Sequence, residues 1–211
     1  MSSFACQTCG TSFEVPAKTL AKYPGWKPRF CREHSPKQAK AKSRPPGLAD
    51  EGMLAPDAVL AKFQDPGQDG LFTDGSCHPN PGPGGWGVVW VEGGRVRDAR
   101  HGYEGGTTNN RMELRALIEA YRMLPEDAAV VVHSDSNLCV QTVTTWAKGW
   151  AARGWKRKEG PIANLDLVRE LYDLSLARPR VELRWIRAHA GHRWNEYADS
   201  LANTWRRDGP G

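Results

Sequence analysis

The chain has 211 residues, of which 39% are hydrophobic and 25% are charged, and its mean hydropathy is −0.61. These values suit one or two globular domains, and no apolar run approaches the ~20 residues that a membrane-spanning helix needs. The first ten residues lack the basic and apolar pattern of a secretory signal. We therefore expect a cytoplasmic protein rather than a membrane protein or a secreted disulfide scaffold.

The net charge of +5 is concentrated in the first quarter of the chain. Residues 1–50 hold nine Lys and Arg against three Asp and Glu, whereas the remainder is nearly neutral. Such asymmetry is typical of a segment that meets an anionic partner, above all nucleic acid, but a solvated basic arm has the same composition.

Three of the five cysteines fall in the first 31 residues. Cys6 and Cys9 form one closely spaced pair, and Cys31 and His34 form a second pair with the same spacing. Two such turns supply the four ligands of tetrahedral zinc. A segment with so few core residues needs a bound metal ion or a similar cross-link in order to fold. We predict one structural Zn²⁺ in a zinc-ribbon-like module over 1–34. Chance clustering and a redox pair at Cys6 and Cys9 are the alternatives.

The rest of the chain divides by composition. Pro, Gly, Lys and Ala dominate 35–70, which predicts a linker with one weak helical turn near 56–62. Beyond residue 71 the composition changes, and eight of the nine Trp lie there. We therefore predict a second, larger domain over 71–211. The two cysteines in this domain, Cys77 and Cys139, are expected to be small core or groove-lining residues rather than metal ligands.

Hydrophobic periodicity and turn residues define the elements of the larger domain. The predicted strands cover 71–74, 86–91, 95–103, 128–133 and 181–187, and the predicted helices cover 110–124, 136–150, 164–177 and 194–207. A Gly and Pro turn occupies 79–85, and a basic excursion with Trp occupies 151–160. This order predicts an α/β fold with a mixed sheet, because the first three strands suit an antiparallel meander and the later ones need helical crossovers.

Four acidic residues stand where such a sheet gathers side chains. Asp74 lies in the first strand on the same face as Phe72, Glu113 lies early in the first helix, and Asp135 follows a buried strand. Asp199 lies in the last helix. Each has a structural alternative, because Glu113 and Asp135 fit helix-capping patterns and Asp199 fits a solvated helix face. Together, packed carboxylates need cations, and hard oxygen donors favour Mg²⁺ or Mn²⁺.

Several motifs carry a resemblance to a known family. The segments LFTDGSCHPNPGPGGWG, TTNNRMEL, SDSNLCV and HAGHRWNEYADSLA, with the excursion at 150–158 between the last two, resemble bacterial-type type 1 ribonuclease H. The resemblance covers residues 71 to about 207. It implies the ribonuclease H-like fold, a five-stranded mixed sheet flanked by helices. It also implies hydrolysis of the RNA strand of RNA–DNA hybrids, leaving 5′-phosphate and 3′-hydroxyl ends.

The same resemblance assigns roles to individual residues. It implies that two Mg²⁺ or Mn²⁺ ions are held by Asp74, Glu113, Asp135 and Asp199, and that His189 is the flexible catalytic histidine. The implied substrate contacts are Gly75, Asn80, Asn109, Asn110, Asn137, Trp155 and Lys156. The excursion matches the family's basic protrusion for the DNA strand, in which we expect Trp146 and Trp150 to be core anchors.

The zinc-ribbon-like module lies outside the resemblance, and its role stays open between holding the hybrid near the active site and docking a protein partner. We expect a monomer. Two other functions compete with the hybrid-specific nuclease. One is a zinc-finger nucleic-acid-binding adaptor on a non-catalytic ribonuclease H-like domain, which the four acids disfavour. The other is a transposase- or resolvase-type nuclease acting on DNA, which the TTNNRMEL segment disfavours.

Overall fold

The computed structural model describes residues 2–22, 27–31, 54–64, 67–188 and 190–209. The chain divides into two compact units, residues 1–49 and 50–211. In the described part of the chain, no helix has the length and apolar character to cross a lipid bilayer. Two predicted site residues, His34 and His189, lie outside the described residues.

The N-terminal unit is a short hairpin followed by a helix. Strand β1 (Ser2–Ala5) pairs antiparallel with β2 (Ser12–Val15), and α1 (Ala17–Lys22) follows. Among the described residues of this unit, the buried side chains are Cys6, Val15 and Pro28. So few buried side chains in the described segments favour a further cross-link there.

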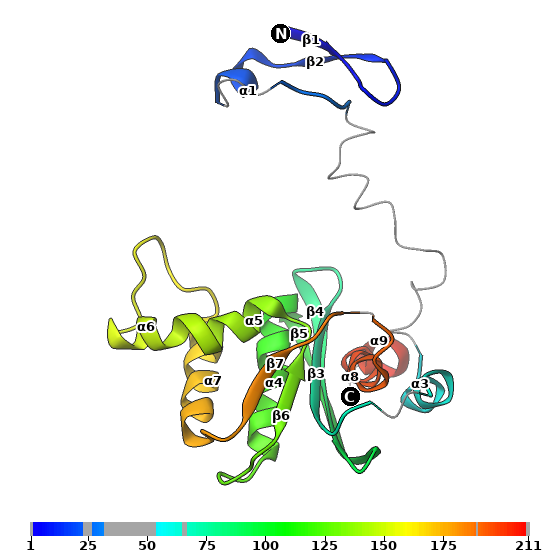
Figure 1. Cartoon of the computed structure of the whole chain (residues 1–211), viewed down its shortest axis with the longest axis vertical. Helices are drawn as coiled ribbons and strands as arrows, with labels where there is room; N and C mark the ends of the chain where they lie inside the picture. The colour runs from blue at the N-terminus through cyan, green and yellow to red at the C-terminus, as the bar shows by residue number, and fades with distance from the viewer. Residues whose placement is uncertain (1, 23–26, 32–53, 65–66, 189, 210–211) are drawn as a thin grey trace. The chain divides into compact units, whose positions relative to one another are not determined.

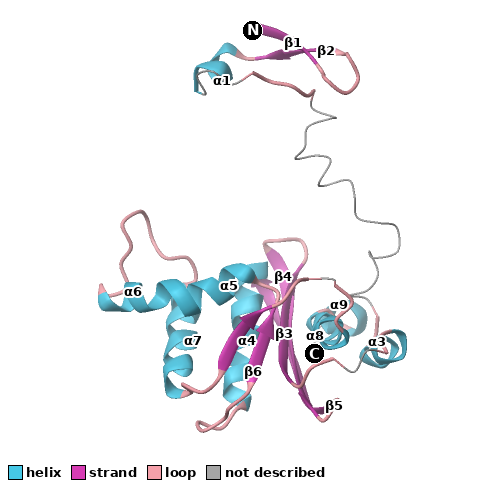
Figure 2. Ribbon diagram, in the orientation of Figure 1, coloured by secondary structure: helices cyan, strands magenta, loops and turns pink. Residues whose placement is uncertain are grey.

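The second unit is built on a five-stranded mixed sheet with the order β5-β4-β3-β6-β7 (Figure 2). Its strands are β3 (Gly70–Cys77), β4 (Gly82–Glu92), β5 (Arg95–Thr107), β6 (Val131–Ser134) and β7 (Glu182–Trp185). The first three form an antiparallel meander, and β6 and β7 add in parallel. The predicted α/β class and mixed five-stranded sheet are confirmed.

Helices cover both faces of this sheet (Figure 1). One face packs against α4 (Asn109–Met123) and α7 (Leu165–Ala177). A long helical segment that precedes α7 in the chain packs on the same face and consists of α5 (Asn137–Gln141), a π-helical turn η2 (Thr142–Trp146) and α6 (Ala147–Ala152). The other face packs against α8 (Arg193–Ala202) and α3 (Pro56–Lys62), and α9 (Thr204–Asp208) follows α8.

Alternation along the strands explains why two separate cores form. Leu71 and Val88 belong to the cluster beneath α4, whereas their neighbours Phe72 and Val89 belong to the cluster beneath α8. Successive side chains of a strand point to opposite faces of the sheet. A central strand with apolar residues at consecutive positions therefore contributes side chains to the core on each face. Asp74 therefore shares the α8 face with Phe72, as the sequence indicated.

Some element boundaries differ from the sequence prediction. Helix α4 begins at Asn109 and is capped by Thr108, whose hydroxyl accepts a hydrogen bond from the Arg111 N–H at 3.4 Å. Strand β6 begins at Val131, three residues later than predicted. The predicted single helix over 194–207 is divided, because Asn203 adopts a non-helical conformation between α8 and α9.

The predicted linker over 35–70 includes residues that belong to the folded second unit. Residues 35–53 lie outside the described part, but Pro56–Lys62 form α3, at the place where one weak helical turn was expected. Val59 is fully buried against α8 in the cluster that contains Trp194 and Tyr197, and the Ser200 hydroxyl donates a hydrogen bond to the Leu54 carbonyl at 2.8 Å. The folded unit thus begins ahead of residue 71.

We expect Val59→Ala to destabilise the second unit by about 2 kcal/mol, because it removes two buried carbon groups and leaves a cavity against α8. Urea unfolding of the full chain measures the change, with Ala58→Ser on the exposed side of α3 as the matched control. Equal stability of the two variants would show that α3 does not contribute to the core.

Candidate active site

The site is built around Asp74 on the central strand β3. Its side chain is 8% exposed, and its Oδ1 atom accepts a hydrogen bond from the Gly75 N–H at 2.8 Å. In the antiparallel pair with β4 it stands opposite Gly87. A carboxylate this deeply buried requires either a proton or a positive charge close by.

Glu113 reaches Asp74 because α4 packs very closely against β3. A Cβ atom at Gly75 would lie 2.2 Å from the backbone N of Glu113, so only glycine permits this approach. Glu113 is 7% exposed, and its Oε2 atom is buried and accepts no hydrogen bond from the described residues. The capping-box alternative for Glu113 is wrong, because Thr108 caps the helix and the third helical position is Arg111.

Asp135 follows β6 at the point where this strand passes Asp74. The parallel pairing of Thr73 with Ser134 places the two aspartates at the same end of neighbouring strands. The alternative that Asp135 caps the next helix is wrong, because the cap position of α5 is Ser136 and carries no side-chain capping bond. The Asp135 Oδ2 atom instead accepts a hydrogen bond from Asn195 Nδ2 at 3.2 Å.

Asp199 approaches the other three from α8, on the opposite side of β3 from α4 (Figure 1). A Cβ atom at Gly87 would lie 2.5 Å from the Ala198 carbonyl oxygen, so a second glycine allows the second helix to come close. Asp199 is half-buried, and its charge helps to raise the pKa of Asp74 after burial, the largest cause. It is therefore not on a solvated helix face.

The carboxylates perturb one another strongly. One carboxylate oxygen each from Asp74, Glu113 and Asp135 lies within 4.8 Å of the other two. Burial, then the charges of Asp199 and Glu113, raise the pKa of Asp74 well above its usual value. Burial, then the charges of Asp135 and Asp199, do the same to the pKa of Glu113. Hard oxygen ligands in this arrangement fit a divalent cation such as Mg²⁺.

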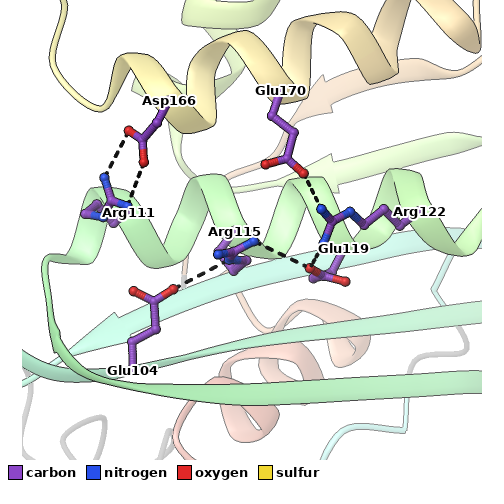
Figure 3. Close-up of polar contacts among 7 residues, drawn as sticks. All are labelled: Glu104, Arg111, Arg115, Glu119, Arg122, Asp166 and Glu170. Carbon is purple, nitrogen blue, oxygen red and sulfur yellow. Dashed lines mark hydrogen bonds and ion pairs between the residues drawn. The ribbon is translucent and has the colours of Figure 1, made fainter.

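Ion pairs hold α4 at its place between the sheet and α7 (Figure 3). Arg111, two residues before Glu113, makes two hydrogen bonds to Asp166 of α7, at 3.1 and 2.9 Å. Farther along α4 a chain of pairs continues through Glu104, Arg115, Glu119, Arg122 and Glu170. The guanidinium of Arg111 lowers the pKa of Asp166. These contacts fix the helix that carries Glu113.

The amide residues predicted to contact substrate lie in the β3–β4 loop and at the first residues of α4 and α5. Asn80 Oδ1 accepts a hydrogen bond from the Asn109 N–H at 3.2 Å, which ties the β3–β4 loop to the start of α4. The Asn137 N–H donates to the Asp135 carbonyl at 3.0 Å. Asn110 lines a cavity of about 340 Å³ together with Trp146, Trp150 and Arg157.

The aromatic residues of the protrusion differ from expectation. Trp155, predicted to contact substrate, packs edge-on against Tyr172 at 5.8 Å, and Arg169 lies 5.5 Å from its ring centre. It therefore anchors the protrusion to α7. Trp150 packs against the core as expected, but Trp146 is 37% exposed and is no core anchor. Lys156 is exposed.

Two residues near the carboxylates were missed at the sequence level. Asn195 and Asn203 each donate a hydrogen bond to a catalytic-site carboxylate, Asn195 to Asp135 and Asn203 to Asp199. Both are buried. Their spacing could have identified them from the sequence. They stand four residues before and four residues after Asp199, so a continuous helix would place all three on the same side.

The predicted zinc ligands are partly described. The thiols of Cys6, Cys9 and Cys31 lie within 4.8 Å of one another, and the Gly10 N–H closes the turn between the first two by donating to the Cys6 carbonyl at 2.8 Å. Burial raises the pKa of the Cys6 thiol, but hydrogen bonds from the backbone of Cys31 and Cys9 outweigh this and lower it to about 6. In the second unit, Cys139 is a buried core residue, whereas Cys77 is half-buried and its thiol donates to the Pro79 and Gly82 carbonyls at 3.2 and 3.5 Å.

The fold and the site together define a class: a mixed α/β sheet of the ribonuclease H-like type whose clustered carboxylates form a site for divalent cations. Comparison with known proteins agrees. The sequence profile of the RNase H family matches residues 67–206. The chain therefore belongs to the ribonuclease H family of enzymes, whose members depend on divalent metal ions.

Individual relatives support the same assignment. Ribonuclease H of Herminiimonas arsenicoxydans is 49% identical over 134 residues, which are 63% of this chain and 90% of that protein. Ribonuclease HI of Caulobacter vibrioides is 46% identical over 134 residues, 63% of this chain and 89% of that protein. The crystal structure of LC9-RNase H1 has a TM-score of 0.53 and 40% identity, and covers 64% of this chain and 70% of that one.

The raised pKa values predict how stability depends on pH without metal. A carboxyl whose pKa is higher in the folded protein makes the folded state less stable as pH rises above about 4. We expect Asp74→Asn to be more stable than the unsubstituted chain in EDTA at pH 7 by about 1 kcal/mol or more, equivalent to about 2–4 °C. The difference should shrink toward pH 4.

Thermal unfolding at pH 4–7, with EDTA and then with Mg²⁺, tests this expectation. Mg²⁺ should stabilise the unsubstituted chain more than Asp74→Asn, since the cation replaces the proton that the cluster lacks. A lower stability of Asp74→Asn in EDTA at pH 7 would contradict the account of mutual repulsion.

Proposed function

We propose that this chain hydrolyses the RNA strand of RNA–DNA hybrids with two divalent cations, producing 5′-phosphate and 3′-hydroxyl ends. The observation that carries the proposal is the cluster of Asp74, Glu113 and Asp135, whose oxygens lie within 4.8 Å of one another and whose Glu113 Oε2 atom is buried with no described donor. Such a cluster of hard oxygen ligands suits the binding of divalent cations.

The carboxylates divide naturally between two ions. Asp74 lies between the others and would be shared, Glu113 and Asp135 would complete one ion's ligands, and Asp199 would belong to the other. When bound, such ions supply an activated water and stabilise the leaving oxygen. The buried carboxylates hold this arrangement in place before substrate arrives, which avoids reorganisation during the reaction. We assign His189 to proton transfer near the leaving group, as its motif implies.

Recognition of RNA is assigned to the amides around this cluster. Asn80 stands in the β3–β4 loop, Asn109 and Asn110 begin α4, which carries Glu113, and Asn137 begins α5, directly after Asp135 and Ser136. Side-chain amides both donate and accept, as a ribose 2′-hydroxyl does, and this hydroxyl distinguishes RNA from DNA. The exposed Arg153, Lys156, Arg157 and Lys158 of the protrusion suit the phosphates of the paired DNA strand.

A panel of labelled substrates tests the proposed function. We expect cleavage of a hybrid in Mg²⁺, and no cleavage of duplex DNA, duplex RNA, single-stranded RNA or a hybrid with 2′-O-methyl ribose throughout its RNA strand. Cleavage of duplex DNA at a comparable rate would replace this proposal with a DNA nuclease. No cleavage of any substrate would favour a binding protein.

We expect Asp74→Asn, Glu113→Gln and Asp135→Asn each to lower hybrid cleavage by at least about a thousandfold while the protein stays folded, because a neutral amide cannot hold the cations together. His189→Ala should act mainly on turnover and more mildly. Single-turnover cleavage and circular dichroism measure the two properties. A folded Asp74→Asn protein with near-normal cleavage would exclude the two-ion site.

We also propose that the N-terminal unit binds one structural Zn²⁺ through Cys6, Cys9 and Cys31, with His34 as the fourth ligand. Three thiols already face one another, and the cysteine with the lowered pKa favours the thiolate that zinc binds. The exposed Lys18, Lys27 and Arg29 suit a unit that holds nucleic acid near the enzyme.

Metal analysis of the purified full chain is expected to find one Zn²⁺ per molecule. Cys6→Ser and Cys31→Ser should abolish zinc binding and unfold the N-terminal unit, with cleavage of short hybrids retained. Cys77→Ser, outside the cluster, is the control and should keep its zinc. Zinc retained by Cys31→Ser would contradict the assignment.

A further inference from the structure

Asp199 is held by the residue that ends its own helix. Asn203 stands between α8 and α9, and its backbone N–H donates to the Asp199 carbonyl at 3.0 Å. Its side-chain amide turns back to the same residue, donating to that carbonyl at 2.9 Å and to Asp199 Oδ1 at 2.8 Å. Asn203 is 4% exposed. The helix break is therefore organised around the Asp199 side chain.

Asp135 is held in a similar way from the other end of α8. Asn195 is 2% exposed, and its amide donates to Asp135 Oδ2 at 3.2 Å. This bond links α8 to the end of β6, two elements that carry different carboxylates of the cluster. The Asn195 Oδ1 atom is buried and accepts no hydrogen bond from the described residues, so it can receive one from a water bound at the site.

A side-chain amide suits these positions beside Asp135 and Asp199 better than a positively charged side chain. It orients a carboxylate by donating to one oxygen, and it brings no positive charge that would compete with a cation for the cluster. Some residues hydrogen-bond to a metal ligand without contacting the metal. Removing such a residue commonly lowers the metal affinity about 10–100-fold. The two amides act on two different carboxylates, Asp135 and Asp199, and neither is itself an acidic ligand.

We propose that Asn203 and Asn195 are positioning residues that orient Asp199 and Asp135 for divalent cations, so that α8 supplies one ligand and aligns a second. This inference rests on the proposed cation site. The competing explanation is that Asn203 only terminates α8 and Asn195 only fills space. In that case their replacement changes the stability of the fold and leaves the cation dependence of the enzyme unchanged.

The test compares Asn203→Leu and Asn195→Ala with Ser200→Ala in the full chain. Ser200 is a matched control because it is buried on the same helix and its hydroxyl bonds to the Leu54 carbonyl, away from the carboxylates. For each protein, hybrid cleavage is measured as a function of Mg²⁺ concentration, KM for the hybrid is measured at saturating Mg²⁺, and the unfolding temperature is measured with and without Mg²⁺.

We expect the Mg²⁺ concentration for half-maximal cleavage to rise about 10–100-fold in Asn203→Leu and in Asn195→Ala, with KM for the hybrid unchanged. The stabilisation by Mg²⁺ should shrink in both, whereas Ser200→Ala should lower only the unfolding temperature.

If both asparagine variants behave like Ser200→Ala, with half-saturation within about twofold of the unsubstituted chain, the inference is wrong. If the unsubstituted chain cleaves equally well in EDTA, the proposed cation site itself fails. Should one asparagine variant not fold, the other decides, because each amide bonds a different carboxylate.

Discussion

The repulsion between buried carboxylates is the constraint on which the rest of this structure depends. Asp74 and Glu113 are both less than a tenth exposed, and burial is the main reason that their charged forms are disfavoured. The charges of Asp199 and Asp135 add to this at both residues, and the charge of Glu113 adds to it at Asp74. Left alone, side chains of this kind would move apart or take up protons. The fold must therefore force them together, and the backbone does so at two glycines. Gly75 admits α4 on one face of β3, and Gly87 admits α8 on the other.

The remaining architecture can be understood as support for those two close contacts. The ion pairs between α4 and α7 fix the helix that carries Glu113, and the cluster of Val59, Phe72 and Trp194 fixes the helix that carries Asp199. We expect stability and function to be opposed at this point, because buried carboxylates that repel one another cost stability when no cation is bound. A divalent cation bound at the cluster would offset this repulsion and so couple cation binding to the stability of the folded protein.

Much of the fold and of the candidate site could be predicted from the sequence. The alternation of Leu71 and Phe72, the apolar stripe of α4 and the turn at Gly93 and Gly94 depend on local periodicity and turn chemistry, and they gave the correct sheet and helices. The four acids were identified from their places in the predicted strands and helices and from the motifs that resemble type 1 ribonuclease H. The features that could not be predicted from the sequence depend on contacts between segments that are distant in the chain. Asn203 breaks a continuous helical pattern in order to bond Asp199, and Trp155 turns inward with a positive φ to meet Tyr172. Helix α3 forms where one weak helical turn was expected, but its burial against Trp194 and Tyr197, which stabilises so short a helix, was not predicted.

The measurement that tests this account most directly is anomalous diffraction from crystals grown with Mn²⁺ and a hybrid whose scissile linkage resists hydrolysis. The account predicts two Mn²⁺ ions about 3.5–4 Å apart. It also predicts that the Asp74 carboxylate contacts both ions, with Asp199 on one of them and Glu113 and Asp135 on the other. A single ion, or an Asp74 carboxylate directed away from the metal, would contradict it.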